Sequence, residues 1–102
     1  MDAMEAIRKT FFEECEEQLA EMEQGLTGMN EGSADAELVN SVFRAVHSIK
    51  GGAGAFKLDA LVSFAHRFET VLDYIRSSRL EATPSTMRVM LRALDVLADL
   101  VR

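Results

Sequence analysis

Apolar residues recur along the chain in steps of three and four, the spacing that places side chains on one face of an α-helix. Mostly Glu, Gln and Thr stand between them in the first segment, about residues 3–29, so this helix is amphipathic. Its apolar positions are Phe11, Cys15, Leu19, Met22, Leu26 and Met29. The sequence N-E-G-S at 30–33 predicts the end of the helix, because Asn and Gly are typical stop residues.

The second segment begins near Asp35 and runs into the glycine-rich stretch 51–54. Its apolar positions are Val39, Val42, Phe43, Val46, Ile49 and Ala53. A short connection at residues 55–57 leads to the third segment, which we expect Asp59 to cap and which fades at residues 77–79. Its apolar positions are Leu61, Val62, Ala65, Phe68, Leu72 and Ile75.

The fourth segment begins with Thr83 as N-cap and Pro84 as first helical residue, a pair of strong start signals. Its apolar positions are Met87, Met90, Leu91, Leu94, Leu97 and Val101. No segment shows the alternation of a β-strand. Four amphipathic helices with short connections predict a single all-α domain over residues 1–102, folded as an antiparallel up-down-up-down four-helix bundle.

Composition and charge narrow the class of protein. The net charge is −6, which argues against nucleic acid or anionic lipid as partner, since both require a basic face. No apolar run approaches the roughly 18–20 residues of a membrane span, and no signal peptide is expected at the N-terminus. The single cysteine cannot form an internal disulfide. We therefore expect a cytoplasmic domain that does not insert into a membrane.

Candidate chemistry is concentrated in A-V-H-S-I-K-G-G-A-G-A-F, residues 45–56. His47 lies about 110° from the centre of the apolar stripe, so we expect it to be exposed. Gly51 and Gly54 follow at i+4 and i+7 and leave the helix surface beside it bare, while Lys50 lies on the same side. Each helical glycine costs roughly 0.8–1.0 kcal/mol relative to alanine, so either the helix ends here or another molecule comes close.

The second histidine, His66, lies three residues before Glu69, so the two share a helix face. Glu69 lies nearer the apolar stripe, and a carboxylate there needs a partner because burying it unpaired is costly. If the second and third helices are neighbours, His47 is that partner. A carboxylate that accepts from its Nδ1–H would fix the tautomer and leave the Nε2 lone pair outward, which is how a weak nucleophile is oriented.

Other interpretations of these residues remain open at this point. An ordinary surface histidine at position 47, with the glycines as a helix C-cap, is one alternative. His47, His66 and Glu69 could form an open zinc site, although Lys50 would place a positive charge beside the metal. A helical adaptor without group transfer would also fit. No glycine-rich loop followed by Lys-Ser/Thr is present, so we expect no nucleotide site and no bound metal or cofactor.

The stretch H-S-I-K-G-G-A-G-A-F, residues 47–56, resembles the phosphoacceptor motif of histidine-containing phosphotransfer (HPt) domains. It is most similar to the N-terminal P1 domain of chemotaxis histidine kinases. T-F-F-E-E at 10–14, F-R-A-V at 43–46 and H-R-F-E at 66–69 resemble the same domain at the expected places. The resemblance covers almost the whole chain, which begins with the first helix as those kinases do.

The resemblance implies a role for each matching residue. His47 would be phosphorylated on Nε2 by the ATP-binding domain of the kinase, and would pass the phosphoryl group to an aspartate in the receiver domain of a CheY-like response regulator. Glu69 would hold Nδ1, while Lys50 and His66 would border the phosphoryl group. ATP and Mg²⁺ would be used by the partner domains, so this domain would belong to a kinase without containing its catalytic site.

A docking surface for the regulator is implied around the histidine. Gly51 and Gly54 would make room for the active site of the regulator, and Arg44, in F-R-A-V, would contact it. Phe12 is a further candidate, because it is offset about 100° from Phe11 and both cannot point at the core centre. An HPt domain of a hybrid sensor kinase is an alternative within the same chemistry.

The chain departs from the family pattern in three places. Lys57-Leu58 stands where many members have Gly-Phe, and Ala55 stands where many have Thr. These changes affect the turn after the second helix and a surface beside the site, so they concern the choice of partner. P1 domains often have a fifth helix, which we do not expect within this chain.

Overall fold

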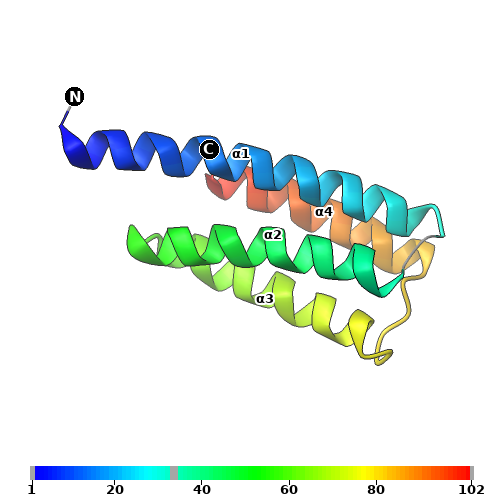
Figure 1. The fold of residues 1–102 in the computed structure, drawn as a ribbon. Helices are drawn as coiled ribbons and strands as arrows, with labels where there is room; N and C mark the ends of the chain where they lie inside the picture. Colours follow the sequence, from blue (N-terminus) through cyan, green and yellow to red (C-terminus); the bar gives the residue numbers. More distant parts are fainter. Residues whose placement is uncertain (1, 33–34, 102) are drawn as a thin grey trace.

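The computed structural model describes residues 2–32 and 35–101, and in these residues it contains four α-helices and no strand (Figure 1). Ser33, the last residue of the predicted break after the first helix, lies outside the described residues. The helices are α1 (Ala3–Asn30), α2 (Ala36–Ala55), α3 (Asp59–Arg76) and α4 (Pro84–Val101). The predicted all-α class is confirmed.

Successive helices run antiparallel, in the predicted up-down-up-down order (Figure 1). α2 packs against α1 and α3, and α4 packs against the same two helices from the other side. The bundle is elongated, with principal extents of 46 × 21 × 21 Å. The first turns of α1 project beyond the end of α4, and residues 2–10 are all exposed (Figure 1). In the described part of the chain, no helix combines the length and apolar character needed to cross a membrane.

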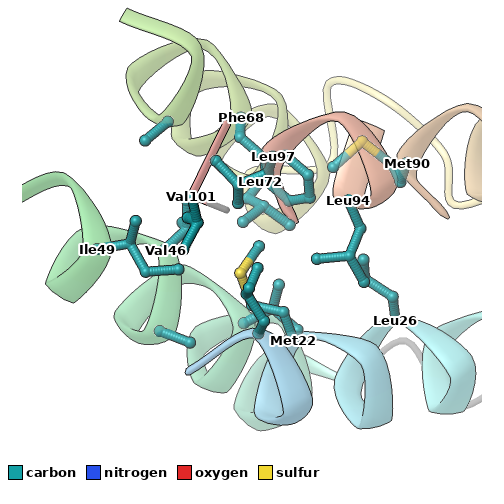
Figure 2. Packing of buried hydrophobic residues seen from close by; sticks show 14 of the residues in the cluster. Met22, Leu26, Val46, Ile49, Phe68, Leu72, Met90, Leu94, Leu97 and Val101 are labelled. Atoms are coloured by element: carbon teal, nitrogen blue, oxygen red, sulfur yellow. The ribbon is translucent and has the colours of Figure 1, made fainter. Parts of the chain in front are cut away.

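All four helices contribute to one apolar core (Figure 2). The stripe predicted for α1 is buried throughout, and those of the other helices are buried with three exceptions. These exceptions are only half-buried because they lie at the edges of their stripes: Phe43, Val62 and Leu91. Gly25 lets α1 approach α2 closely, since a Cβ there would lie 2.3 Å from a methyl group of Val42.

Side-chain caps begin two of the predicted helices where the sequence signals them. Asp35 Oδ1 accepts a hydrogen bond from the backbone N–H of Leu38 at 2.8 Å, and Thr83 Oγ1 accepts from that of Thr86 at 3.2 Å. The prediction for α3 is wrong by one residue. Leu58 holds the N-cap position without a side-chain hydrogen bond, and Asp59 is the first helical residue. Its negative charge in the first turn still stabilises the helix, because it interacts favourably with the helix dipole.

α2 does not end at its glycines but continues through them to Ala55. The chain then reverses at Lys57, whose φ of 57° lies in the left-handed region that favours glycine. The backbone N–H of Leu58 donates to Ala53 at 3.0 Å and that of Lys57 to Gly54 at 3.2 Å, as in a Schellman-type helix end. The departure at Lys57 therefore falls where glycine would relieve strain, and the turn forms nonetheless.

We expect the thiol of Cys15 to be protected in the folded chain. Burial, together with the smaller effect of the neighbouring charges of Glu14 and Glu16, raises its pKa from 9.0 to about 11. The folded state thus holds the thiol proton more tightly than the unfolded state. The resulting contribution to stability is complete below about pH 9 and is lost between about pH 9 and pH 11.

A disulfide reagent at pH 8 should modify the thiol of Cys15 far more slowly in native protein than in guanidinium-unfolded protein, and equal rates would contradict the burial.

Candidate functional site

The site lies on the outer edge of the contact between α2 and α3, where polar side chains replace the apolar core. We call this edge the α2–α3 seam. α2 contributes Asn40, Phe43, His47 and Lys50, which recur at helical spacing on one side of the helix. α3 contributes Glu69, Asp73 and Arg76, also spaced by three or four residues. Because the two helices are antiparallel, the end of one set faces the beginning of the other.

Glu69 is the one charged residue that is buried within the described parts of the chain. Its Oε2 lies 2.5 Å from Nδ1 of His47, and its Oε1 lies 2.5 Å from Nζ of Lys50. Each carboxylate oxygen therefore has a partner on α2, one in His47 and the other in Lys50. The predicted contact of His47 with Glu69 is present, and Lys50, expected on the same side of the helix as His47, binds the same carboxylate. Because Glu69 is buried, its carboxylate needs both partners.

His47 combines a fixed nitrogen with an accessible ring. Its side chain is 61% exposed, whereas that of Glu69 is 6% exposed. Because an ionised carboxylate can only accept hydrogen bonds, the contact assigns the proton to Nδ1. The neutral imidazole then carries its lone pair on Nε2. An exposed histidine is thus held in the tautomer that leaves its second nitrogen nucleophilic.

Lys50 supplies the opposite charge to the buried carboxylate. Its side chain is 26% exposed, so its ammonium group lies between the protein interior and solvent. A buried carboxylate beside a nucleophile would repel an approaching phosphate, and the ammonium group offsets that charge. The site thus places the imidazole beside a carboxylate whose charge an ammonium group balances.

The three glycines of α2 serve two different purposes. A Cβ on Gly52 would lie 2.3 Å from the ring of Phe11, so this glycine is required by the packing of α1. A Cβ on Gly51 or Gly54 would meet nothing within 4 Å. Packing within the chain does not explain these two glycines, and both are exposed on the helix that carries His47.

Phe43 belongs to the site, although the sequence analysis counted it with the core. Its ring lies nearly parallel to the imidazole of His47, with an interplanar angle of 9° and a centroid separation of 6.1 Å. The guanidinium carbon of Arg76 lies 4.5 Å from the centroid of the same phenyl ring. The signal was present in the sequence, because residues 43 and 47 are four apart and therefore neighbours on a helix.

The remaining candidates lie at different distances from this group. Arg44 is exposed on α2, one turn before His47. His66 is exposed on α3, one turn before Glu69. Phe12 is half-buried against Phe11 and lines a hollow between α1 and α4, so the structure does not bring it to the seam.

The donors that could hold a metal ion are not gathered in the described structure. In residues 2–32 and 35–101, no group of three or more His, Cys, Asp or Glu side chains is placed to share a metal. His47 and Glu69 are in contact, but Lys50 occupies the second oxygen of the carboxylate. The arrangement fits an oriented nucleophile better than a metal centre.

Comparison with known proteins points to the same chemistry. The family model for the Hpt domain matches residues 6–100. The chain is 66% identical over 97 residues to the chemotaxis protein CheA of Rhizobium meliloti (strain 1021), and 52% identical over 99 residues to CheA of Cereibacter sphaeroides. These matches cover 95% and 94% of this chain but only 13% and 14% of those proteins.

The fold is also found among solved structures. The CheA phosphotransferase domain from Thermotoga maritima superposes with a TM-score of 0.87 at 28% sequence identity. The superposition covers 99% of this chain and 95% of that chain. With a family match over nearly its full length and the same four-helix arrangement, the chain belongs to the Hpt domain family.

Proposed function

We propose that the chain is the phosphotransfer domain of a chemotaxis histidine kinase and that His47 is its phosphoacceptor. The observation that carries this proposal is the contact of an exposed imidazole, through Nδ1, with the buried carboxylate of Glu69. The relatives at 66% and 52% identity are CheA proteins, which favours a chemotaxis kinase over a hybrid sensor kinase. Such a domain would work in the cytoplasm, where ATP is available.

The proposed reaction has two steps. The Nε2 lone pair of His47 attacks the γ-phosphorus of ATP, which is held with Mg²⁺ by the ATP-binding domain of the kinase. The N–P bond forms as the bond to the β,γ-bridging oxygen breaks and ADP leaves with the electron pair. An aspartate carboxylate of the regulator then attacks the phosphorus, and the N–P bond breaks with return of the lone pair to Nε2. Positioning and charge stabilisation by the partners dominate such transfers.

Glu69 and Lys50 would act on the two charges that change during transfer. The imidazole becomes positive as Nε2 bonds to phosphorus, and the carboxylate that accepts from Nδ1–H stabilises that charge. The ammonium group of Lys50 is bound to the same carboxylate, so it lies close to the ring and favours the anionic phosphoryl group. His66, one turn from Glu69, is proposed to border this group from α3.

The regulator would dock on the exposed side of α2. Arg44, Gly51 and Gly54 lie on this helix within two turns of His47 and are all exposed. A receiver domain presents its acidic active site to the histidine, and Arg44 offers the complementary charge. Phe12 stays a prediction as a docking residue, since the hollow it lines lies between α1 and α4.

A transfer assay tests the identity of the phosphoacceptor. The chain is mixed with a CheA-type ATP-binding domain and radiolabelled ATP, and we expect label that is stable to base and labile to acid. His47→Gln should abolish the label, because no nucleophile remains, whereas His66→Gln should keep it. Label that persists in His47→Gln, or none in a folded wild-type chain with several kinase domains, would refute the proposal.

Replacement of Glu69 by alanine should slow phosphorylation of His47 by about 10–100-fold, the loss expected for one hydrogen bond to a charged group. The fold should survive, because water can reach the seam and solvate Lys50. Circular dichroism measures the fold and the label measures the rate. Glu37→Ala, an exposed carboxylate on α2, serves as the control and should change neither. An unchanged rate in Glu69→Ala would remove its orienting role.

Alanine at the three glycines should separate stability from transfer. Gly51→Ala and Gly54→Ala should each stabilise the helix by about 0.5–1 kcal/mol, because alanine is the better helix former and nothing lies in the way. Both should slow transfer to the regulator. Gly52→Ala should instead destabilise the bundle by about 1–3 kcal/mol through the clash with Phe11. Transfer at the wild-type rate in both Gly51→Ala and Gly54→Ala would show that the regulator does not need a helix surface without side chains at these positions.

A further inference from the structure

We propose that Phe43 and Arg76 are positioning residues that fix the plane of the His47 imidazole. This inference rests on the proposed role of His47 as phosphoacceptor, and it adds a second support to the one that Glu69 provides. The two residues lie on the α2–α3 seam, on the side of His47 away from Lys50 and the glycines.

The contact with Glu69 leaves one degree of freedom open. A hydrogen bond at Nδ1 fixes the position of one ring atom, but coupled rotation about the two side-chain bonds, χ1 and χ2, can still tilt the plane of the ring. Core packing does not prevent this rotation, because the His47 side chain is 61% exposed. Such a tilt swings Nε2 and its lone pair, and in-line attack on phosphorus depends on their direction.

Phe43 provides the missing constraint. Its ring is parallel to the imidazole to within 9°, and the centroid separation of 6.1 Å lies in the range of offset aromatic pairs. Because residues 43 and 47 are one turn apart on α2, the helix itself sets this separation. The hydrogen bond of Nδ1 with Glu69 and the stacking of the ring on Phe43 together define where Nε2 points.

Arg76 in turn holds Phe43. Its guanidinium carbon lies over the phenyl ring at 4.5 Å from the centroid. Nη1 donates to Asn40 Oδ1 at 3.0 Å, and Nη2 donates to the carboxylate of Asp73. Asn40 belongs to α2 and Asp73 to α3, so the guanidinium group is held from both helices. A planar cation fixed in this way keeps the half-buried phenyl ring in one orientation.

The test compares Phe43→Leu with Phe64→Leu. Phe64 is a matched control, because it is also half-buried but lines the hollow between α3 and α4. Two quantities are measured on the purified chain. One is the NMR shift of the ring protons of His47, which the current in a stacked phenyl ring displaces. The other is the rate of phosphorylation by the ATP-binding domain of a CheA-type kinase.

We expect Phe43→Leu to remove the ring-current shift of His47 and to slow phosphorylation about three- to tenfold. Phe64→Leu should change neither, even if it destabilises the bundle more. Phe43→Tyr keeps an aromatic face and should restore both quantities. The proposal is overturned if Phe43→Leu leaves the rate at the wild-type value, or if Phe64→Leu slows it equally.

Arg76→Gln tests whether Arg76 holds the ring of Phe43. Its control is Arg79→Gln, at an exposed arginine in the connection after α3. We expect a loss of about twofold in rate and a partial loss of the ring-current shift for Arg76→Gln alone. Unchanged values in Arg76→Gln would refute the part of the proposal that concerns Arg76. If the wild-type chain accepts no phosphoryl group at all, the proposed function fails, while the ring-proton shifts still show whether Phe43 stacks on the imidazole.

Discussion

The buried carboxylate of Glu69 is the constraint on which the site depends. A carboxylate removed from water must find hydrogen-bond donors, and both of its oxygens are satisfied from α2, by His47 and by Lys50. The register of α2 against α3 in this structure satisfies both at once. That register also brings Arg76 over Phe43, so the polar edge of the bundle is set by a single desolvated charge.

α2 carries core residues on one side and the exposed site on the other. Its inner side carries Val46, Ile49 and Ala53 into the core, where the packing of four helices stabilises it. Its outer side carries an imidazole followed by exposed glycines, which weaken the helix locally. The free energy gained by core packing offsets this weakness. The bare surface can therefore persist in a helix that remains continuous.

The sequence predicts the parts of this structure that depend on spacing and burial. Helical periodicity locates the four helices, and the demand of a buried carboxylate for a partner predicts the contact of Glu69 with His47. The sequence does not predict features that depend on the exact backbone conformation or on which helix lies beside a residue. Whether Asp59 caps α3 depends on the backbone at Leu58, and the role of Phe43 depends on which helix lies beside it. An apolar residue at the edge of a stripe looks like core until the facing helix is known.

The path of α2 through its glycines has a consequence for motion. Between Ile49, which is fixed in the core, and Phe56, whose ring lies 5.2 Å from that of Phe11, the helix contains three glycines. Such a stretch has low intrinsic helical stability, and Gly51 and Gly54 are the part of it that no side chain packs against. Ala53 is held in the core and Gly52 lies against Phe11, so motion of the backbone is limited to the exposed side of this turn. A protein that docks beside His47, as proposed, would therefore meet a backbone surface that the core holds in place.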